Sequence, residues 1–422
     1  MAWNIIIERC MNRNKRYSIM KGIISICLAM ISVAFLRGQG QAPRVQLKSP
    51  EVSADRRVTF RLWAPEAQNV SVKYLPLVSS STFKSALTKD DRGVWSVTTR
   101  PIEPDIYPYV LVVDGVMIPD PANPLVMTGV AGEIASMVHV PGPASLSWEV
   151  NNVPHGSVVH HFYHSDLIGD DRDFYVYTPP LYDPVSNTKY PVLYLLHGLG
   201  SNASGWITAL HANVILDNLI AQGKAKRMVV VTPLAYGFAN PANGVIGRTS
   251  DRKKEFDMLT ASILSEVMPI IENTYRVATD RESRAIAGFS SGGAQSFYIG
   301  LNHVDKFAYV AGFSNALLTY PSPLQAMGSR ALPPGQSYPP LDPGVFANVF
   351  PRLDAKSASQ LRLLWISCGM EDRLIGHNRQ FRDWLQAKNI QFKYLETPGE
   401  HTVMVWRRNL TELVPLLFQA TK

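Results

Sequence analysis

The sequence predicts two domains of different fold class, an all-β sandwich followed by a mostly parallel sheet with helices on both faces. Residues 43–140 contain short segments in which apolar and polar residues alternate, as in half-buried strands. From about residue 157 the apolar runs become continuous, which is typical of strands buried on both faces. Helix-like segments separate these runs, and strand–helix alternation of this kind builds a parallel sheet.

Four alternating segments stand out in the first domain, and turn-forming residues separate them. They are RVTFRLWAP (57–65), NVSVKYL (69–75), GVWSVTT (93–99) and YPYVLVVDG (107–115). Short strands at this spacing predict a β-sandwich over residues 43–145. The Pro/Gly/Ser stretch VPGPASLSW (140–148) is predicted to be its exit linker.

The second domain, residues 155–422, contains four apolar runs bounded by Gly, Pro or polar residues. They are YPVLYLLHG (190–198), RMVVVTPLA (227–235), SRAIAGFSS (283–291) and LRLLWISCG (361–369). Helices are expected near 204–222 and 256–275, and after each of the last two runs. Residues 318–351 contain eight prolines and no periodicity, so we expect a long insertion there.

Residues 1–42 have the composition of a secretory signal peptide. Basic side chains precede the uninterrupted apolar run GIISICLAMISVAFL (22–36), and small residues suited to cleavage follow it. The run is shorter than the roughly 20 residues that span a bilayer. We therefore expect a secreted or periplasmic protein with no stable membrane partner, and an uncleaved anchor is the alternative.

Charge and cysteine content exclude two further classes of protein. The formal net charge is +7, but most of the excess lies in the first 42 residues, so no clustered basic face predicts nucleic-acid binding. Cys10 and Cys27 lie in the same leader, which leaves Cys368 alone. We expect no intramolecular disulfide.

The segment AGFSSGGAQ (287–295) has the form of a nucleophile elbow. Its G-x-S-x-G pattern is weak evidence by itself, but an apolar strand precedes it and a helix-like segment follows. That context would expose the Ser290 hydroxyl at the carboxyl end of the sheet, and Gly288 and Gly292 would allow the tight turn. The alternative is a close-packed turn without chemistry.

A serine nucleophile needs a histidine base, and three histidines follow Ser290 in the chain. His303 falls at the end of the helix after the elbow and His377 lies within a helix-like stretch. His401 follows the strand-like FKYLE and the loop ETPGE, where a catalytic histidine is expected.

The acid that orients the base is expected at the carboxyl end of another strand. The run LLWISCGMED ends on two carboxylates, and we choose Asp372, with Glu371 as its competitor. The order serine, acid, histidine is that of α/β-hydrolases. A surface ion pair is the alternative for either carboxylate.

The segment LLHGLGSNASGW (195–206) is predicted to complete an oxyanion hole. Its loop follows a strand, so the backbone N–H of Leu199 and that of Ser291 would bind the same oxygen. His197 is interpreted as a brace for this loop rather than a catalytic group.

Three histidines that lie close together in the second domain have a structural interpretation as well as a functional one. His160, His161 and His164 suggest a metal site, but neighbours on a strand point to opposite faces and no acidic or Cys partner is expected close by. We interpret the cluster as structural and expect neither a metal nor a cofactor.

Four aromatic side chains of the first domain are interpreted as core or interdomain packing, with sugar stacking as the alternative: Trp63, Trp95, Tyr107 and Tyr109.

The motifs YPVLYLLHGLGSNASGW, AGFSSGGAQ, SCGMED and PGEH, in this order, resemble carbohydrate esterase family 1. That group includes feruloyl and acetylxylan esterases, with enterochelin esterase and esterase D as relatives. The resemblance covers about residues 155–420 and implies an α/β-hydrolase fold. It also implies a catalytic triad and oxyanion donors at the positions named above: Ser290, Asp372, His401, Leu199 and Ser291. Ser291 stands where the family commonly has Met, but only its backbone N–H is required.

The first domain, with RVTFRLWAPEAQNVSV and VDGVMIPDPANP, resembles the immunoglobulin-like module that precedes glycogen-branching enzymes. Together the resemblances imply a serine esterase acting on esterified plant polysaccharide, releasing ferulate from arabinoxylan, and the leader predicts that it is exported. Trp206 and Trp406 are candidate substrate-binding residues. The alternatives are an acetylxylan esterase, an enterochelin-type siderophore esterase, and a non-catalytic carbohydrate-binding protein.

Overall fold

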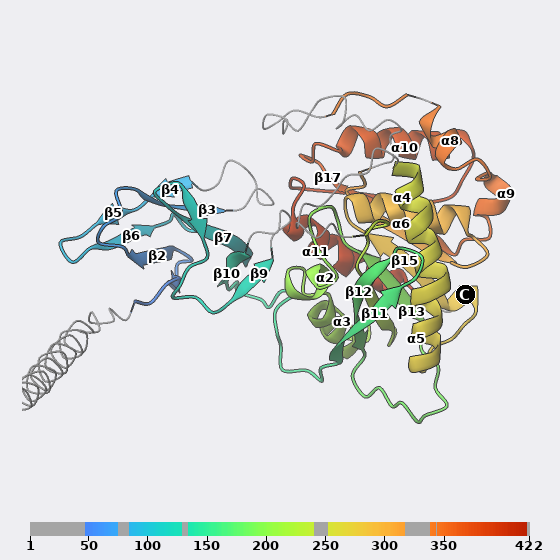
Figure 1. The fold of residues 1–422 in the computed structure, drawn as a ribbon, viewed down its shortest axis with the longest axis horizontal. Coiled ribbons are helices and arrows are strands. Elements are labelled where there is room, and N and C mark those ends of the chain that lie inside the picture. The colour runs from blue at the N-terminus through green and yellow to red at the C-terminus, as the bar shows by residue number, and fades with distance from the viewer. Residues whose placement is uncertain are drawn as a thin grey trace, which may run out of the picture. The chain divides into compact units, whose positions relative to one another are not determined.

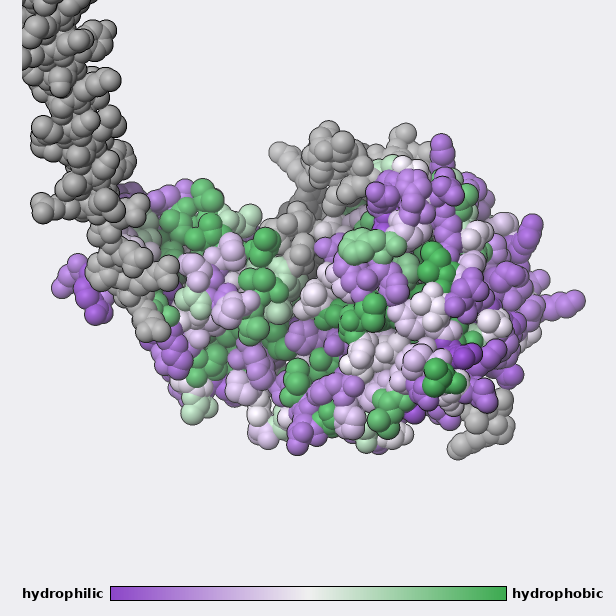
Figure 2. Space-filling view, turned by 60° about the horizontal axis from the view of Figure 1, so that its bottom comes forward, coloured by the Kyte–Doolittle hydropathy of each residue, from purple (hydrophilic) through white to green (hydrophobic). Residues whose placement is uncertain are grey.

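The computed structural model describes residues 47–74, 84–128, 134–239, 252–316, 338–342 and 344–419. The predicted leader lies outside these residues, and so does most of the proline-rich insertion. Among the described residues, no helix is long and apolar enough to cross a membrane. On the face drawn in Figure 2, groups of hydrophobic residues alternate with hydrophilic ones.

The first domain is a sandwich of two antiparallel sheets, as predicted (Figure 1). One sheet has the order β1-β2-β6-β5, formed by Glu51–Val52, Val58–Trp63, Val94–Thr98 and Thr88–Lys89. The other has the order β4-β3-β7-β10-β9, formed by Lys84–Ala86, Val70–Tyr74, Asp105–Val113, Ile134–Val140 and Val126–Thr128. A short strand, β8 (Val116–Ile118), pairs with β7. Alternate residues of β2 are buried, which is why its sequence alternates.

Three of the four aromatic residues singled out from the sequence of the first domain belong to the core of the sandwich. Trp95, Tyr107 and Tyr109 are at most 8% exposed and pack in the cluster between the sheets. Trp63 is 41% exposed and donates from its indole N–H to the carbonyl of Arg92. The core interpretation is therefore wrong for Trp63, because the last residue of β2 points out of the sandwich.

The second domain is built on an eight-stranded sheet of order β11-β12-β14-β13-β15-β16-β17-β18. The strands, in chain order, are Ser157–Ser165, Asp170–Thr178, Val192–Leu196, Val229–Pro233, Arg284–Gly288, Tyr309–Phe313, Leu363–Gly369 and Lys393–Thr397. The pairings β11–β12 and β12–β14 are antiparallel, and the remaining six strands are parallel to one another. β13 to β17 are fully buried, which accounts for their continuous apolar sequences.

Helices cover both faces of this sheet, and each face has its own hydrophobic core. One core includes residues of α4 (Arg252–Ser262), α5 (Met268–Thr274), α6 (Ser291–Asn302), α8 (Val345–Val349), α9 (Ala355–Ala358) and α10 (Ile375–Ala387). The other includes residues of α2 (Gly205–Thr208), α3 (Ala212–Ala221) and α11 (Val403–Leu413). This architecture confirms the predicted α/β-hydrolase fold class.

Two long predicted helices differ from the observed ones. The stretch 204–222 is broken between α2 and α3, where His211 has a left-handed backbone with φ of 55°. The stretch 256–275 is continuous (Figure 1), but a π-helical segment, Ile263–Val267, joins α4 to α5. Strands β12 and β16 are not predicted from the sequence, which indicates a strand in this region only at the histidine cluster within β11.

A buried ion pair joins the sandwich to the second domain. The Arg407 guanidinium of α11 lies 3.3 Å from the Asp105 carboxylate of β7 and donates to the Ile106 carbonyl. The Trp148 indole N–H donates to the same carboxylate at 3.0 Å. Both charged side chains are at most 5% exposed, and burial raises the pKa of Asp105 although Arg407 opposes the shift.

We expect Arg407→Met to lower the free energy of unfolding by about 3–5 kcal/mol, because it leaves the Asp105 charge buried without its partner. Chemical denaturation measures the loss. The double variant Asp105→Leu/Arg407→Met removes both charges and should recover most of it. A loss below about 1 kcal/mol in the single variant would contradict the role of this pair.

Candidate active site

Ser290 occupies a strained turn between β15 and α6. Its backbone has φ of 54° and ψ of −120°, a conformation that non-glycine residues rarely adopt. The Ser290 N–H donates to the Phe313 carbonyl, and the Ser290 carbonyl accepts from the Ala316 N–H at 3.0 Å. These bonds to β16 and the segment after it hold the strained residue in place.

Close backbone contacts explain why glycines flank Ser290. A Cβ added at Gly288 would lie 2.4 Å from the Gly292 carbonyl oxygen, and one added at Gly292 would lie 2.3 Å from the His197 carbonyl oxygen. Real Cβ atoms do not approach backbone so closely, so the turn requires glycine at both positions. The turn therefore has the geometry of a nucleophile elbow.

We expect Gly292→Ala to lower stability by about 1–3 kcal/mol and to reduce any activity at Ser290, because the elbow must shift to make room. Thermal unfolding and an ester assay measure the two effects. Gly376→Ala in α10 is the matched control, because nothing lies within 4 Å of its added Cβ. It should stabilise the helix by up to about 1 kcal/mol. Equal Tm values for the two variants would contradict the close-contact argument.

The structure brings together the three residues chosen from the sequence. The Ser290 Oγ lies 3.0 Å from His401 Nε2, and His401 Nδ1 lies 2.8 Å from Asp372 Oδ2. An ionised carboxylate only accepts hydrogen bonds, so His401 Nδ1 carries the proton and Nε2 is left to accept from the serine hydroxyl. This arrangement can remove a proton from Ser290.

The environment of Asp372 favours its ionised form. The side chain is 1% exposed, and burial alone would raise its pKa. The electrostatic interaction and hydrogen bond with His401, with the Leu374 N–H donating at 2.8 Å, bring the pKa of Asp372 below the ordinary aspartate value. The stability that this carboxylate contributes is present at neutral pH and is lost only as the pH falls through that lowered pKa.

The competing candidates lie outside this hydrogen-bonded chain. Glu371 accepts from the Gly399 N–H at 2.5 Å, so it ties the loop of Asp372 to the loop that leads to His401. His377 is buried in α10, with Nε2 2.8 Å from the Pro339 carbonyl. His303 directly follows α6, the helix that leads away from the elbow.

The two predicted oxyanion donors lie on segments next to the elbow. Ser291 begins α6, and Leu199 lies in the loop between β13 and α2. That loop touches the elbow, because a Cβ added at Gly198 would lie 3.1 Å from the Ser290 Cβ. Among the described residues, the N–H groups of Leu199 and Ser291 donate to no backbone or side-chain acceptor. Both are therefore free to bind an oxygen.

His197 has a fixed tautomer and is neutral. The Ala235 N–H donates to His197 Nε2 at 2.9 Å, so the proton resides on Nδ1, which donates to the Gly198 carbonyl at 2.8 Å. Burial lowers the pKa of His197 to about 4. The imidazole thus holds the start of the Leu199 loop against the end of β14.

Trp206 and Trp406 do not line the site, which corrects the prediction that they bind substrate. Both are at most 1% exposed. Trp206 packs against Phe289 and donates to the Leu196 carbonyl. Trp406 stacks on Phe289 at 4.2 Å and meets the His401 ring edge-on at 4.9 Å. Helix α11 turns its apolar face inward, so Trp406 supports the imidazole from the core.

Each imidazole of the predicted structural cluster has its own partner. His160 lies 2.7 Å from the Asp173 carboxylate, and His164 lies 2.8 Å from that of Asp171. His161 is hydrogen-bonded to the Tyr275 hydroxyl. Acidic partners are therefore present, on the neighbouring strand β12 for two of the three histidines, which corrects the argument made from local sequence. No group of three metal-binding side chains occurs in the described part of the chain.

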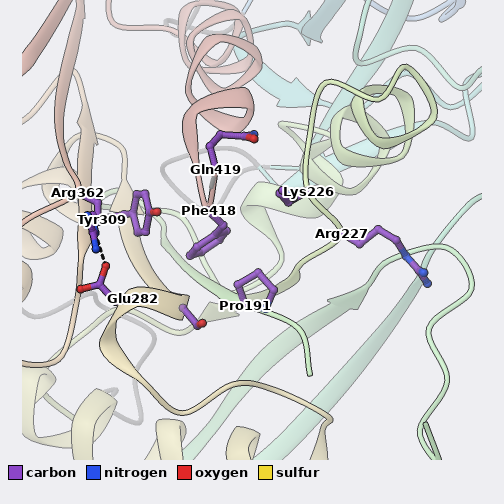
Figure 3. A pocket seen from close by; sticks show the side chains of 9 residues that line it. Pro191, Lys226, Arg227, Glu282, Tyr309, Arg362, Phe418 and Gln419 are labelled. Atoms are coloured by element: carbon purple, nitrogen blue, oxygen red, sulfur yellow. Dashed lines mark hydrogen bonds and ion pairs between the residues drawn. The ribbon is translucent and has the colours of Figure 1, made fainter. Parts of the chain in front are cut away.

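A hollow of about 340 Å³ lies at the amino ends of β15 and β16, whereas Ser290 lies at the carboxyl end of β15. Tyr309 and Phe418 form part of its wall, and Arg362 is paired with Glu282 there (Figure 3). No residue of the Ser290 site lines it. The site at Ser290 is therefore separate from this hollow.

Sequence reasoning missed the residues that hold the Leu199 loop from outside. Tyr236 bonds to the loop, and Arg172 and Gln295 bond to the segment that contains Tyr236. These residues come from β12, from α6 and from the segment after β14. No motif marks them, because they meet only in the folded chain.

The fold and the arrangement of Ser290, His401 and Asp372 define an α/β hydrolase with a serine at its elbow. The model of the putative esterase family matches residues 165–417, and the chain belongs to that family. Residues 49–121 match the model of carbohydrate-binding module 48, the isoamylase N-terminal domain. This match agrees with the resemblance of the sandwich to modules of glycogen-branching enzymes.

The chain is similar to an endo-1,4-beta-xylanase/feruloyl esterase of Xylanibacter ruminicola, with 28% identity over 377 residues. The match covers 88% of this chain and 46% of that relative, so the chain spans about half of its length. A solved ferulic acid esterase is 26% identical with a TM-score of 0.52, covering 63% of this chain and 98% of that one.

An enterochelin esterase from Shigella flexneri has a TM-score of 0.63 at 17% identity, with coverage of 90% of this chain and 99% of that one. At this identity the similarity shows a shared fold.

Proposed function

We propose that the chain is an exported serine carboxylic-ester hydrolase that releases ferulate from feruloylated arabinoxylan. The observation that carries the reaction type is the hydrogen-bonded chain from the Ser290 hydroxyl through His401 to the buried Asp372. Membership of the putative esterase family supports the ester substrate. The ferulate substrate rests on the similarity to the xylanase/feruloyl esterase and to the ferulic acid esterase structure.

In the proposed acylation, the Ser290 Oγ attacks the ester carbonyl while His401 Nε2 takes its proton. The new imidazolium is stabilised by the Asp372 carboxylate on its other nitrogen. The carbonyl oxygen becomes an anion, and the N–H groups of Leu199 and Ser291 bind it. When the tetrahedral intermediate collapses, His401 returns the proton to the leaving sugar hydroxyl, and an acyl-enzyme remains.

Deacylation repeats these roles with water as the nucleophile. His401 removes a proton from a water molecule, which attacks the acyl carbonyl, and the Ser290 oxygen leaves with that proton. The products are the free acid and the regenerated serine. These steps use only the chain's own residues.

The substrate is tested by measuring hydrolysis of methyl ferulate, p-nitrophenyl acetate and a catecholate ester by the same preparation, with Ser290→Ala as the control. Turnover of methyl ferulate that the control lacks supports the proposal. Turnover of acetate alone would move the substrate to acetylated xylan, and turnover of the catecholate ester alone would move it to siderophores. If no ester is turned over, the chain is better explained as a carbohydrate-binding protein.

Export rests on the composition of residues 1–42. Expression of the full chain followed by N-terminal sequencing of the periplasmic or secreted product tests it. A mature N-terminus near Gly40 or Ala42 supports cleavage. Retention of the whole chain in the membrane fraction would support the uncleaved anchor instead.

A further inference from the structure

One tyrosine hydroxyl bonds to two successive residues of the loop that contains Leu199. The Tyr236 hydroxyl accepts a hydrogen bond from the Gly200 N–H at 2.9 Å and donates one to the Ser201 carbonyl at 2.9 Å. Burial raises the pKa of Tyr236 to about 12, so the hydroxyl retains the proton that it donates. Gly200 directly follows Leu199, and its φ of 81° makes this a sharp turn.

Two buried side chains, those of Arg172 and Gln295, hold the backbone around Tyr236. The Arg172 guanidinium, from β12, donates to the carbonyls of Leu234 at 2.8 Å and Tyr236 at 2.6 Å. The Gln295 side chain, from the helix that follows Ser290, donates to the Ala235 carbonyl at 2.9 Å. Arg172 and Gln295 are each 2% exposed.

The same segment contacts the start of the loop. The Ala235 N–H bonds to His197, whose ring packs edge-on against the Tyr236 ring at 5.1 Å. The segment 234–236 is therefore anchored to the nucleophile helix, to β12 and to the end of β13. A group attached to so rigid a segment can determine the position of a short loop beside it.

We infer that Tyr236 is a positioning residue, whose hydroxyl holds the Leu199 N–H in the direction of the oxyanion through its two bonds to Gly200 and Ser201. This inference rests on the proposed esterase function. The Gly200 N–H belongs to the peptide group that follows Leu199, so fixing it limits rotation about the Leu199 backbone. Among the described residues the loop has few other backbone bonds, including one from the Ser201 N–H to the Gly198 carbonyl at 3.2 Å.

Tyr236→Phe removes the hydroxyl and keeps the ring that packs on His197. We expect kcat for a hydrolysed ester to fall by about 10- to 100-fold, because a misplaced donor stabilises the oxyanion poorly. KM should change by less than about threefold, because the bond to the oxygen strengthens in the transition state. Tyr182→Phe is the matched control, since its hydroxyl also accepts one backbone N–H, that of Arg276 at 2.7 Å.

Two further measurements separate positioning from general destabilisation. Phenylboronic acid forms a tetrahedral anionic adduct on a reactive serine, so its inhibition constant should rise in Tyr236→Phe by about the same factor as kcat falls. Hydrogen exchange of the peptide that covers residues 197–206 should become at least about tenfold faster in Tyr236→Phe and stay unchanged in Tyr182→Phe. The exchange measurement does not depend on any substrate.

The inference is overturned if kcat of Tyr236→Phe stays within about threefold of the unmodified protein, or if the exchange of residues 197–206 does not change. It is also overturned if kcat falls while boronate inhibition is unaffected. Failure of the unmodified chain to hydrolyse any ester, with exchange accelerated as expected, would instead contradict the proposed function and leave the loop-holding role of Tyr236 in place.

Discussion

Replacing Ser290 by alanine is expected to lower kcat for ester hydrolysis by about 10⁵-fold or more, the loss that removal of a triad serine typically causes. The reason is that no other hydroxyl in the described residues is hydrogen-bonded to His401 Nε2. Without the Ser290 Oγ, no acyl-enzyme can form. Steady-state assays with the best ester substrate measure the loss.

Ser291→Ala decides which of the two adjacent serines is the nucleophile. We expect this variant to keep kcat within about tenfold, because the proposed role of Ser291 uses its backbone N–H. A loss in Ser291→Ala as large as that in Ser290→Ala would contradict the assignment.

Ser290→Gly adds a test of the strain at the elbow. Glycine adopts a φ of 54° without the cost that a side chain imposes there. The free energy of unfolding of Ser290→Gly should therefore exceed that of Ser290→Ala by about 1 kcal/mol, while both variants remain inactive. Chemical denaturation of the two inactive variants compares them directly. Equal stability of Ser290→Gly and Ser290→Ala would show that the elbow stores no strain.

Asp372→Asn is expected to lower kcat by about 10³- to 10⁴-fold with little change in structure. The Leu374 N–H donates to Asp372 Oδ1, so the amide oxygen of the asparagine would take that position. Its NH₂ group would then face His401 Nδ1 and donate to it. This selects the imidazole tautomer with the proton on Nε2, which cannot accept the proton of Ser290.

Glu371→Gln tests the competing assignment by the same chemical change one residue earlier. Its side chain bonds to the Gly399 N–H, which an amide oxygen can also accept, so we expect a much smaller loss than for Asp372→Asn. Measuring kcat/KM over a range of pH completes the test. If Glu371→Gln were the more damaging of the two, Asp372 would not be the acid of the triad.

Local sequence was sufficient for the elements that have a strong pattern of their own. The buried strands β13, β14, β15 and β17 appear as continuous apolar runs because both of their faces pack against helices. The elbow was found from Gly288 and Gly292 because its backbone contacts leave no room for a side chain. The chain order of Ser290, Asp372 and His401 then followed from where strands end.

Residues whose partners are distant in sequence could not be assigned in this way. Trp206 and Trp406 resembled substrate-binding residues, but burial in the core depends on which face of a helix meets the sheet. The acidic partners of the histidine cluster lie across the β11–β12 hairpin, 7 and 13 residues further along the chain, and the register of that hairpin decides which carboxylate meets which imidazole. The partners of Arg407 and Tyr236 could not be predicted either, because they are distant from these residues in the sequence.

The sequence by itself determined the fold class and a nucleophile, acid and base in the chain order of α/β-hydrolases, because local backbone requirements and hydrophobic periodicity are recorded in neighbouring residues. Only the tertiary structure decided the 3.0 Å and 2.8 Å contacts that join those three residues, and the hydrogen bond between Tyr236 and the Leu199 loop. The physical reason is that hydrogen bonds act over about 3 Å. Only folding brings groups separated by 111 residues, as Ser290 and His401 are, to that distance.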